Sequence, residues 1–168
     1  AIRMSKLVTE ISEAAIVDND LVTKKRERVD LSSVMEEIVE HYVESNEFPK
    51  LKITKSIQSK VIVNGLPDRL GQVVVNLLDN AVTFARPVGE IKVTLTKRWR
   101  KGVVLEIEDS GPGIKPELTE VIFDRFYTSR KGTATVENAS GLGLAISKQI
   151  IEAHGGSIAV TQSDLGGA

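Results

Sequence analysis

Alternating apolar and polar residues in two neighbouring segments constrain the fold more than any other feature of this sequence. Apolar side chains fill every second position of residues 91–95 and 103–107: they are Ile91, Val93, Leu95, Val103, Leu105 and Ile107. Successive side chains of a strand point to opposite faces of a sheet, so both segments predict strands with one buried face. A sheet with a single apolar face needs helices to cover it.

Three segments carry apolar residues at the helical spacing that such a cover requires. The first follows Asp30, a residue type that often caps a helix. The second spans about residues 67–85, and the third about 141–153, before Gly155-Gly156. The predicted buried face of the second helix consists of Leu70, Val73, Val74, Leu77, Ala81 and Phe84.

Shorter apolar segments predict further strands near residues 51–57 and 61–64 and from residues 158–160 onward. Residues 110–140 have no periodicity, apart from a short predicted helix around 117–122. A structureless stretch of about 30 residues inside a compact domain is typical of a functional lid or of disorder. The element order therefore predicts an α+β fold, in which helices cover one face of a mixed sheet.

The chain length of 168 residues suits one domain with a short appendage. The appendage is residues 1–23, where the apolar spacing predicts a helix with either a coiled-coil seam or an ordinary amphipathic face. The charged segment 24–30 is interpreted as a linker, and residues 31–168 as the domain. Because the chain opens on Ala1 without a start signal, we expect it to be a piece of a longer protein.

Composition excludes several classes of function. The 22 basic and 23 acidic residues give a net charge of −1, so no basic surface argues for binding to nucleic acid. The chain has no cysteine, which excludes disulfides and thiolate metal sites. No apolar run in the sequence approaches the roughly 18 residues that a membrane span requires.

Polar residues on the predicted helix 67–85 form a stripe beside its apolar face. Gln72, Asn76, Asn80 and Thr83 fall within about 80° of the helix circumference. The amide oxygens of Asn76 and Asn80 suit Mg²⁺, with Asn80 the expected ligand and Asn76 its partner. The stripe is equally compatible with an ordinary polar flank that binds nothing.

The second alternating strand runs into the sequence Asp109-Ser-Gly-Pro-Gly-Ile114. Asp109 shares a face with the apolar residues, so its carboxylate is expected at the core side and needs a hydrogen-bond donor. The amino group of adenine is such a donor, whereas guanine presents a carbonyl there, so Asp109 would select adenine. Gly111 and Gly113 would let the backbone approach the base. The alternative is a tight turn without a ligand.

Two further motifs flank the aperiodic stretch. Ser140-Gly-Leu-Gly-Leu144 places glycines at a helix start, where backbone N–H groups and the helix dipole favour phosphate. No Gly-Lys-Ser/Thr follows, so this is not a P-loop. On the other side, Phe123 and Tyr127 belong to an aromatic cluster that is either the base of the lid or a small satellite core. Basic residues that could reach phosphate oxygens are Arg125, Arg130 and Lys131.

In this order and at these separations, the motifs resemble those of the bacterial sensor histidine kinases and their wider ATPase superfamily. Residues 76–81 are similar to the family's N box, 109–114 to its G1 box, 123–127 to its F box and 141–144 to its G2 box. The resemblance covers about residues 28–166. It implies a two-layer α/β sandwich of the Bergerat type, with three helices on one face of the sheet and a long ATP lid, that binds ATP and Mg²⁺. The nucleotide-binding set carried over from the family is Asn76, Asn80, Thr83, Asp109, Gly111, Gly113, Ile114, Phe123, Tyr127, Ser140, Gly141, Leu142, Gly143 and Leu144, with Asn80 and Asn76 as metal ligands.

The same resemblance implies a role within a longer protein. The γ-phosphoryl group of ATP would pass to a histidine on a dimerisation domain outside the chain, and then to an aspartate of a response regulator. Residues 1–22 resemble the end of the second helix of that domain, so the parent would be a homodimer. The sequence of residues 126–132 and 139–156 is similar to that of alphaproteobacterial envelope and acid sensors. This similarity implies a cytoplasmic domain of an inner-membrane receptor.

Three alternatives remain within the superfamily. The ATPases similar to this family carry a Glu one helical turn before the magnesium asparagine, as the base that activates water. Here that position is Asn76, which cannot take a proton, and this favours the kinase. A serine kinase acting on a partner protein is disfavoured by the helix at residues 1–22. A binding module without activity is disfavoured by the intact motif residues.

Overall fold

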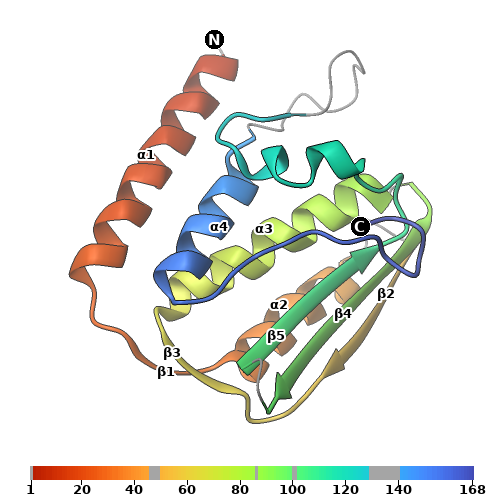
Figure 1. Cartoon of the computed structure of the whole chain (residues 1–168), viewed down its shortest axis with the longest axis horizontal. Helices are drawn as coiled ribbons and strands as arrows, with labels where there is room; N and C mark the ends of the chain where they lie inside the picture. Colours follow the sequence, from red (N-terminus) through yellow and green to blue (C-terminus); the bar gives the residue numbers. More distant parts are fainter. Residues whose placement is uncertain (1, 46–49, 86, 100–101, 129–140) are drawn as a thin grey trace.

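The computed structural model of the chain describes residues 2–45, 50–85, 87–99, 102–128 and 141–168, with the backbone alone described at 2–11 and 13. In chain order its elements are α1 (Ile2–Thr23), β1 (Glu27–Asp30), α2 (Leu31–Glu44), β2 (Leu51–Ile57), β3 (Ile62–Gly65), α3 (Pro67–Ala85), β4 (Gly89–Arg98), β5 (Gly102–Asp109), the short 3-10 turns η1 (Pro116–Leu118) and η2 (Val121–Phe123), and α4 (Gly143–Ala153). Figure 1 shows how helices and sheet are layered.

The main sheet is mixed, as predicted. Its strand order is β2-β4-β5, with β2 and β4 parallel and β4 and β5 antiparallel. The register pairs Ile91 with Asp109, so the end of β5 lies beside the start of β4. A separate two-stranded sheet joins β1 to β3 in antiparallel fashion. Strand β1 lies inside the segment 24–30 that the sequence analysis interprets as a linker, so four of its seven residues are part of a sheet.

Helices α2 and α3 pack on the same face of the main sheet. The side chains of Ile91, Val93 and Leu95 on β4 are fully buried, and they share one apolar cluster with Met35 of α2 and Leu78 of α3. Helix α4 packs against α3 (Figure 1). The alternation in the sequence therefore correctly identified the buried face of β4.

The start of α2 confirms the predicted cap at Asp30. Its Oδ1 atom accepts hydrogen bonds from the backbone N–H groups of Ser32 at 3.1 Å and Ser33 at 3.4 Å. These bonds satisfy donors that have no partner within the helix.

The predicted buried face of α3 needs one correction. Leu78 is fully buried, whereas Phe84, which the sequence analysis assigned to the core, remains 36% exposed. The apolar surface of α3 is wider than a single stripe because the helix contacts the sheet on one side and α4 on another. Leu77 packs toward α4 and α1 in a second cluster, and this shifts the core position to Leu78.

Two predicted elements differ from the structure. The strand expected from residues 158–160 onward is absent: residues 156–163 carry no regular secondary structure. The chain instead turns back at Ser163, whose N–H donates to the Gly167 oxygen at 3.0 Å, so its backbone pairing with β5 is limited to Asp109. The helix expected around residues 117–122 is replaced by η1 and η2, two single 3-10 turns.

Helix α1 packs against the α3–α4 layer through a second apolar cluster, whose buried members are Ala14, Val17, Val73, Leu142, Ile146 and Ile150. Within the described part of the chain, none of the helices is both long and apolar enough to cross a membrane.

Candidate nucleotide-binding site

A pocket of about 630 Å³ lies between α3, β5, the η2 turn, the start of α4 and the C-terminal segment. Among the residues that line it, the site predicted from sequence contributes Asn80, Asp109, Gly113, Ile114, Phe123 and Leu144. These residues come from all four sequence motifs, which the fold therefore brings together around one space.

Asp109 lies at the end of β5 and is only 8% exposed. Its Oδ1 atom accepts a hydrogen bond from the N–H of Gly111 at 2.7 Å. Burial raises the pKa of the Asp109 carboxyl, and the backbone hydrogen bonds from Gly111 and Ala168 oppose that rise only in part. A buried carboxylate at a pocket wall favours a ligand that offers a hydrogen-bond donor.

The close approach of the backbone explains the glycine at position 111. A Cβ atom built there would lie 2.7 Å from Asp109 Oδ1, closer than real Cβ atoms come, and 3.0 Å from the Phe84 carbonyl oxygen, tighter than most real contacts. The glycine thus allows the turn after β5 to fold back onto the carboxylate of Asp109.

Asn76 connects the N box to the G2 box. Its Nδ2 atom donates to the Gly143 carbonyl oxygen at 3.1 Å and to the Ser147 hydroxyl at 3.3 Å. Asn80, one turn further along α3, lines the pocket, whereas Asn76 does not. The two amides that the sequence analysis grouped therefore have different surroundings: one faces the pocket and the other binds the start of α4.

The F box contacts the G2 box through backbone atoms. The Phe126 N–H donates to the Gly141 carbonyl oxygen at 3.0 Å. Gly141 has a φ of +72°, and a Cβ atom there would lie 2.5 Å from the Tyr127 carbonyl oxygen. The sequence analysis predicted that this helix starts at about residue 141, but α4 starts at Gly143. The backbone at Gly141 is left-handed and therefore cannot be part of the helix.

Several predicted site residues lie outside the pocket or outside the described residues. Arg125 donates from Nη2 to Gln149 Oε1 on α4 at 3.3 Å and does not line the pocket. The other predicted residues that do not line it are Thr83, Gly111, Tyr127, Gly141, Leu142 and Gly143. Arg130, Lys131 and Ser140 fall within residues 129–140, which the structure does not describe.

The sequence analysis missed the apolar wall of the pocket. Its residues are Leu77, Ala81 and Phe84 on α3 and Leu105 and Ile107 on β5. The sequence analysis had assigned these residues to the core. Their position could have indicated the pocket wall, because the three residues of α3 flank Asn80 at helical spacing.

One basic residue of the pocket was also missed. Lys92 lines it, and its Nζ atom lies 2.8 Å from Glu108 Oε2, a contact that raises the pKa of Lys92. Within the described residues, no group of three or more His, Asp or Glu side chains is arranged to hold a metal ion. Asn80 is the predicted metal ligand that lines this pocket.

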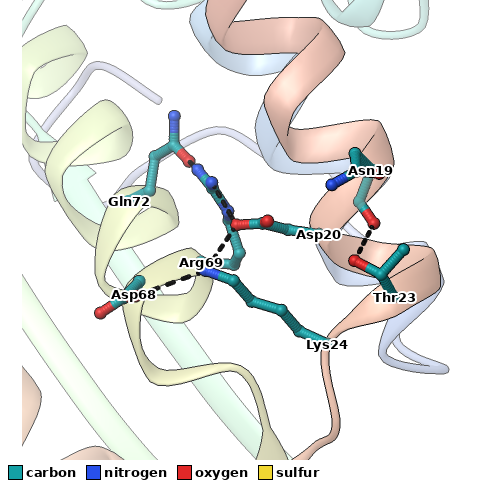
Figure 2. Close-up of polar contacts among 7 residues, drawn as sticks. All are labelled: Asn19, Asp20, Thr23, Lys24, Asp68, Arg69 and Gln72. Carbon is teal, nitrogen blue, oxygen red and sulfur yellow. Dashed lines mark hydrogen bonds and ion pairs between the residues drawn. The ribbon is translucent and has the colours of Figure 1, made fainter.

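The polar side of α3 near its N-terminus faces α1 instead of the pocket. Gln72, which the sequence analysis placed on the same polar stripe as Asn80, accepts a hydrogen bond from Arg69, and Arg69 is paired with Asp20 of α1 (Figure 2). The polar stripe of α3 is thus divided into a part that holds α1 and a part that faces the pocket.

Comparison with known proteins identifies the family. Residues 65–168 match the family of histidine kinase-, DNA gyrase B-, and HSP90-like ATPases. The chain belongs to this family. Its match begins just before α3 and includes every motif around the pocket, which confirms the family predicted from the sequence.

Among curated relatives, the chain is 37% identical over 164 residues to the sensor protein ChvG of Rhizobium meliloti strain 1021, and the match covers 93% of this chain. It is 34% identical over 164 residues to the sensor protein SrrB of Staphylococcus aureus, which covers 98% of this chain. In both cases the chain spans only 28% of the relative's length. The likeness to an alphaproteobacterial sensor agrees with the resemblance seen in the sequence.

Solved structures support the same assignment for the fold. The chain matches the mycobacterial sensor histidine kinase MprB with a TM-score of 0.71 and 33% identity, over 83% of this chain and 87% of that one. It matches the catalytic domain of the histidine kinase ThkA with a TM-score of 0.72 and 28% identity, over 84% and 92%. This member of the family therefore has the fold of histidine kinase catalytic domains.

Proposed function

We propose that the chain binds ATP with Mg²⁺ and donates the γ-phosphoryl group to a histidine on the dimerisation domain of its parent sensor kinase. The observation that carries the proposal is the pocket where Asp109, Asn80, Phe123 and Leu144 meet. A buried carboxylate suits the amino group of adenine, and the apolar residues of α3 and β5 suit the faces of its ring.

In this proposal Asn80 would hold Mg²⁺ with Asn76 as its partner, and the cation would supply positive charge to neutralise the phosphates. Asn80 fits this role because its side chain lines the pocket and offers a hard oxygen ligand. We propose that the remaining nucleotide-binding residues are those carried over from the family motifs, and that Arg125, Arg130 and Lys131 stabilise phosphate.

The reaction needs no general base from the chain. A neutral imidazole nitrogen attacks the γ-phosphorus, the bond to the β–γ bridging oxygen breaks, and ADP leaves while the ring proton passes to water. The contribution of the chain is to position ATP and to neutralise its charge. The acceptor histidine then passes the phosphoryl group to an aspartate of a response regulator.

An ATPase that transfers phosphate to water is the second candidate, and the contacts of Asn76 speak against it. An amide is not basic enough to take a proton from water. Its nitrogen donates to Gly143 and Ser147, so this position holds α4 in place instead. A serine kinase is the third candidate and is separated by the test below.

For the parent protein, we propose that residues 1–23 end a dimerisation helix, 24–30 connect it, and 31–168 form the catalytic domain. The parent would be a homodimeric receptor of the inner membrane with its catalytic part in the cytoplasm. The sensor proteins among the relatives support this arrangement.

Incubation with γ-labelled ATP tests the proposal. The chain alone should remain unlabelled, and addition of the parent's dimerisation domain should produce label that acid removes, because phosphohistidine is acid-labile. Asp109→Asn should abolish most of the transfer, and Asn64→Ala, on the exposed surface of β3, should not. Acid-stable label would support the serine kinase, and rapid release of phosphate without any label would support the ATPase.

A further inference from the structure

Helix α1 is fixed to α3 by a polar cluster that we name the latch, made of Asp20, Lys24, Arg69 and Gln72. Arg69 lies 2.5 Å from Asp20 Oδ2 through Nη2 and 3.1 Å from it through Nε, and its Nη1 donates to Gln72 Oε1 at 2.7 Å (Figure 2). The side chains of Asp20 and Arg69 are only 8% and 16% exposed. Removal of Asp20 would leave the nearly buried guanidinium of Arg69 without a carboxylate, which destabilises the docked arrangement.

Lys24 adds a second cation to the latch. Its Nζ atom lies 2.8 Å from Asp20 Oδ2, and hydrogen bonds from Lys24 and Arg69 lower the pKa of Asp20. Lys24 is half exposed, whereas Arg69 is enclosed by α1 and α3, so the latch depends mainly on Arg69.

The docked helix contacts the start of α4 as well. Leu142, of the G2 box, is 2% exposed because it packs in one cluster with Ala14 and Val17 of α1. It immediately precedes Gly143, whose carbonyl oxygen accepts the hydrogen bond of Asn76. Leu144, two positions further, lines the pocket. Helix α1 thus supports the segment that borders the nucleotide site.

Two more contacts join α1 and its linker to the same layer. Gln149 of α4 donates to Asp18 of α1 and accepts from Arg125 of the F box, so a chain of side chains runs from α1 to the F box. Arg26 donates to the carbonyl oxygen of Ala153 at the end of α4, where a cation satisfies a free carbonyl. Helix α4 is therefore held by α1 at its start and in its middle, and by the linker at its end.

We propose that Arg69 is a positioning residue for nucleotide binding: through Asp20 it holds α1 in place, α1 buries Leu142, and the ordered start of α4 completes the ATP pocket. This inference rests on the proposed function. The affinity for ATP then depends on the docking of α1, and linkage requires that bound ATP stabilise the docked helix by the same factor. Movement of the dimerisation helix away from α3 would therefore lower the affinity of the chain for nucleotide.

Charge reversal tests the inference. Asp20→Arg and Arg69→Asp each place like charges together, whereas the double variant restores an opposite pair. Each variant is titrated with a fluorescent adenine nucleotide that ATP displaces, and hydrogen exchange is followed at residues 142–147 and 14–23. Thr23→Ala is the matched control, because it removes a hydrogen bond from the same turn of α1, to the Asn19 oxygen, without touching the latch.

We expect each single variant to weaken ATP binding roughly 5-fold or more, a typical size for coupling between sites, and to speed exchange at residues 142–147. The double variant should recover most of both, and Thr23→Ala should match the wild type. Should a reversed charge prevent folding, Asp20→Asn is expected to shift both measurements in the same direction. If Arg69 served only local stability, the single variants would unfold more easily in urea while their ATP affinity stayed at the wild-type value.

Two outcomes overturn different claims. Equal ATP affinity in the wild type and in a single variant whose residues 14–23 exchange freely overturns this inference and leaves the proposed function intact. A wild-type chain that binds no ATP overturns the proposed function and, with it, this inference.

Discussion

The amide nitrogen of Asn76 donates a hydrogen bond to the carbonyl oxygen of Gly143, 67 residues further along the chain. The bond joins the middle of α3 to the first residue of α4, and a second bond reaches the Ser147 hydroxyl, which is fully buried. One side chain thus sets the distance between the helix that carries Asn80 and the helix that begins with the G2 box.

Replacement of Asn76 by Ala should therefore weaken ATP binding with and without magnesium. It should also lower the free energy of unfolding by about 1–3 kcal/mol, because the buried Ser147 hydroxyl and the Gly143 carbonyl lose a donor. Urea unfolding and nucleotide titration measure the two effects. An unchanged free energy of unfolding would show that the bonds to α4 are not retained in solution.

Asn80→Ala should act only when magnesium is present. The side chain lines the pocket, and we propose its oxygen as a ligand of the cation, so the variant should lose the increase in ATP affinity that Mg²⁺ produces. Isothermal titration with Mg²⁺ and with EDTA makes the comparison, and the exposed Asn64→Ala serves as the control. Equal loss of affinity in both buffers would contradict a role as metal ligand.

Asp109→Asn should reduce the affinity for ATP and remove the preference for ATP over GTP. The carboxylate accepts a hydrogen bond from an adenine amino group, whereas the Asn side chain also offers a donor that fits the guanine carbonyl. Competition titrations with both nucleotides measure the preference. A wild-type chain that binds ATP and GTP equally would refute the assignment of Asp109.

The same substitution should raise stability at neutral pH. Burial raises the pKa of Asp109 in the folded chain, so the folded state binds a proton more readily than the unfolded state does. Stability then falls as the pH rises from the ordinary aspartate pKa through the raised one, and the ionised carboxylate destabilises the fold above that window. Asn cannot ionise, so its advantage in urea unfolding should be present at pH 7 and disappear toward pH 3.

Gly141→Ala should cost more than Gly155→Ala. Both glycines have positive φ, at +72° and +78°, and share the conformational cost of about 1–2 kcal/mol for a side chain in this region. Only at Gly141 would the new Cβ atom collide with the Tyr127 carbonyl oxygen, because Gly155 has open space around it. Thermal unfolding and ATP titration of the pair compare the two, and equal losses would argue against the contact between the F box and G2 box.

Trp99 should not report nucleotide binding. It is the single tryptophan of the chain, is 99% exposed, and follows the end of β4 that pairs with Gly102, whereas Asp109 pairs near the start of β4. An eight-residue strand separates the two ends by on the order of 20 Å. Its emission should stay at the wavelength of water-exposed tryptophan when ATP is added, whereas a Phe84→Trp variant, with the new side chain at the pocket, should respond.

Local patterns predicted the elements of the fold well where a single face is buried. The alternation in β4 and the cap at Asp30 were identified because each depends on residues close in sequence. Phe84 was misplaced because periodicity reveals an apolar face and cannot tell a core from a pocket wall. The expected last strand failed for a similar reason: alternation around residues 158–160 says nothing about whether the sheet edge is available to pair with it.

The contacts between distant elements could not be predicted from sequence. Asp20 and Arg69 are separated by 49 residues, and neither belongs to a recognisable motif. Ser32 is also buried, and its hydroxyl joins the Gln58 oxygen to the Val61 N–H, although its sequence position indicates only the first turn of a helix. The motif residues were found because their chemistry is specific, whereas these partners are specific only in three dimensions.

Strands β2 and β4 run parallel, so after β2 the chain must return to the end of the sheet at which β2 begins before β4 can pair with it. Part of that return path is α3, the helix that carries Asn76 and Asn80. Because the crossover must be in place before the parallel pair closes, the nucleotide site and the sheet should form in one cooperative folding step. Any circular permutation that opens the chain between β2 and β4 would remove this tether while retaining every residue of the pocket.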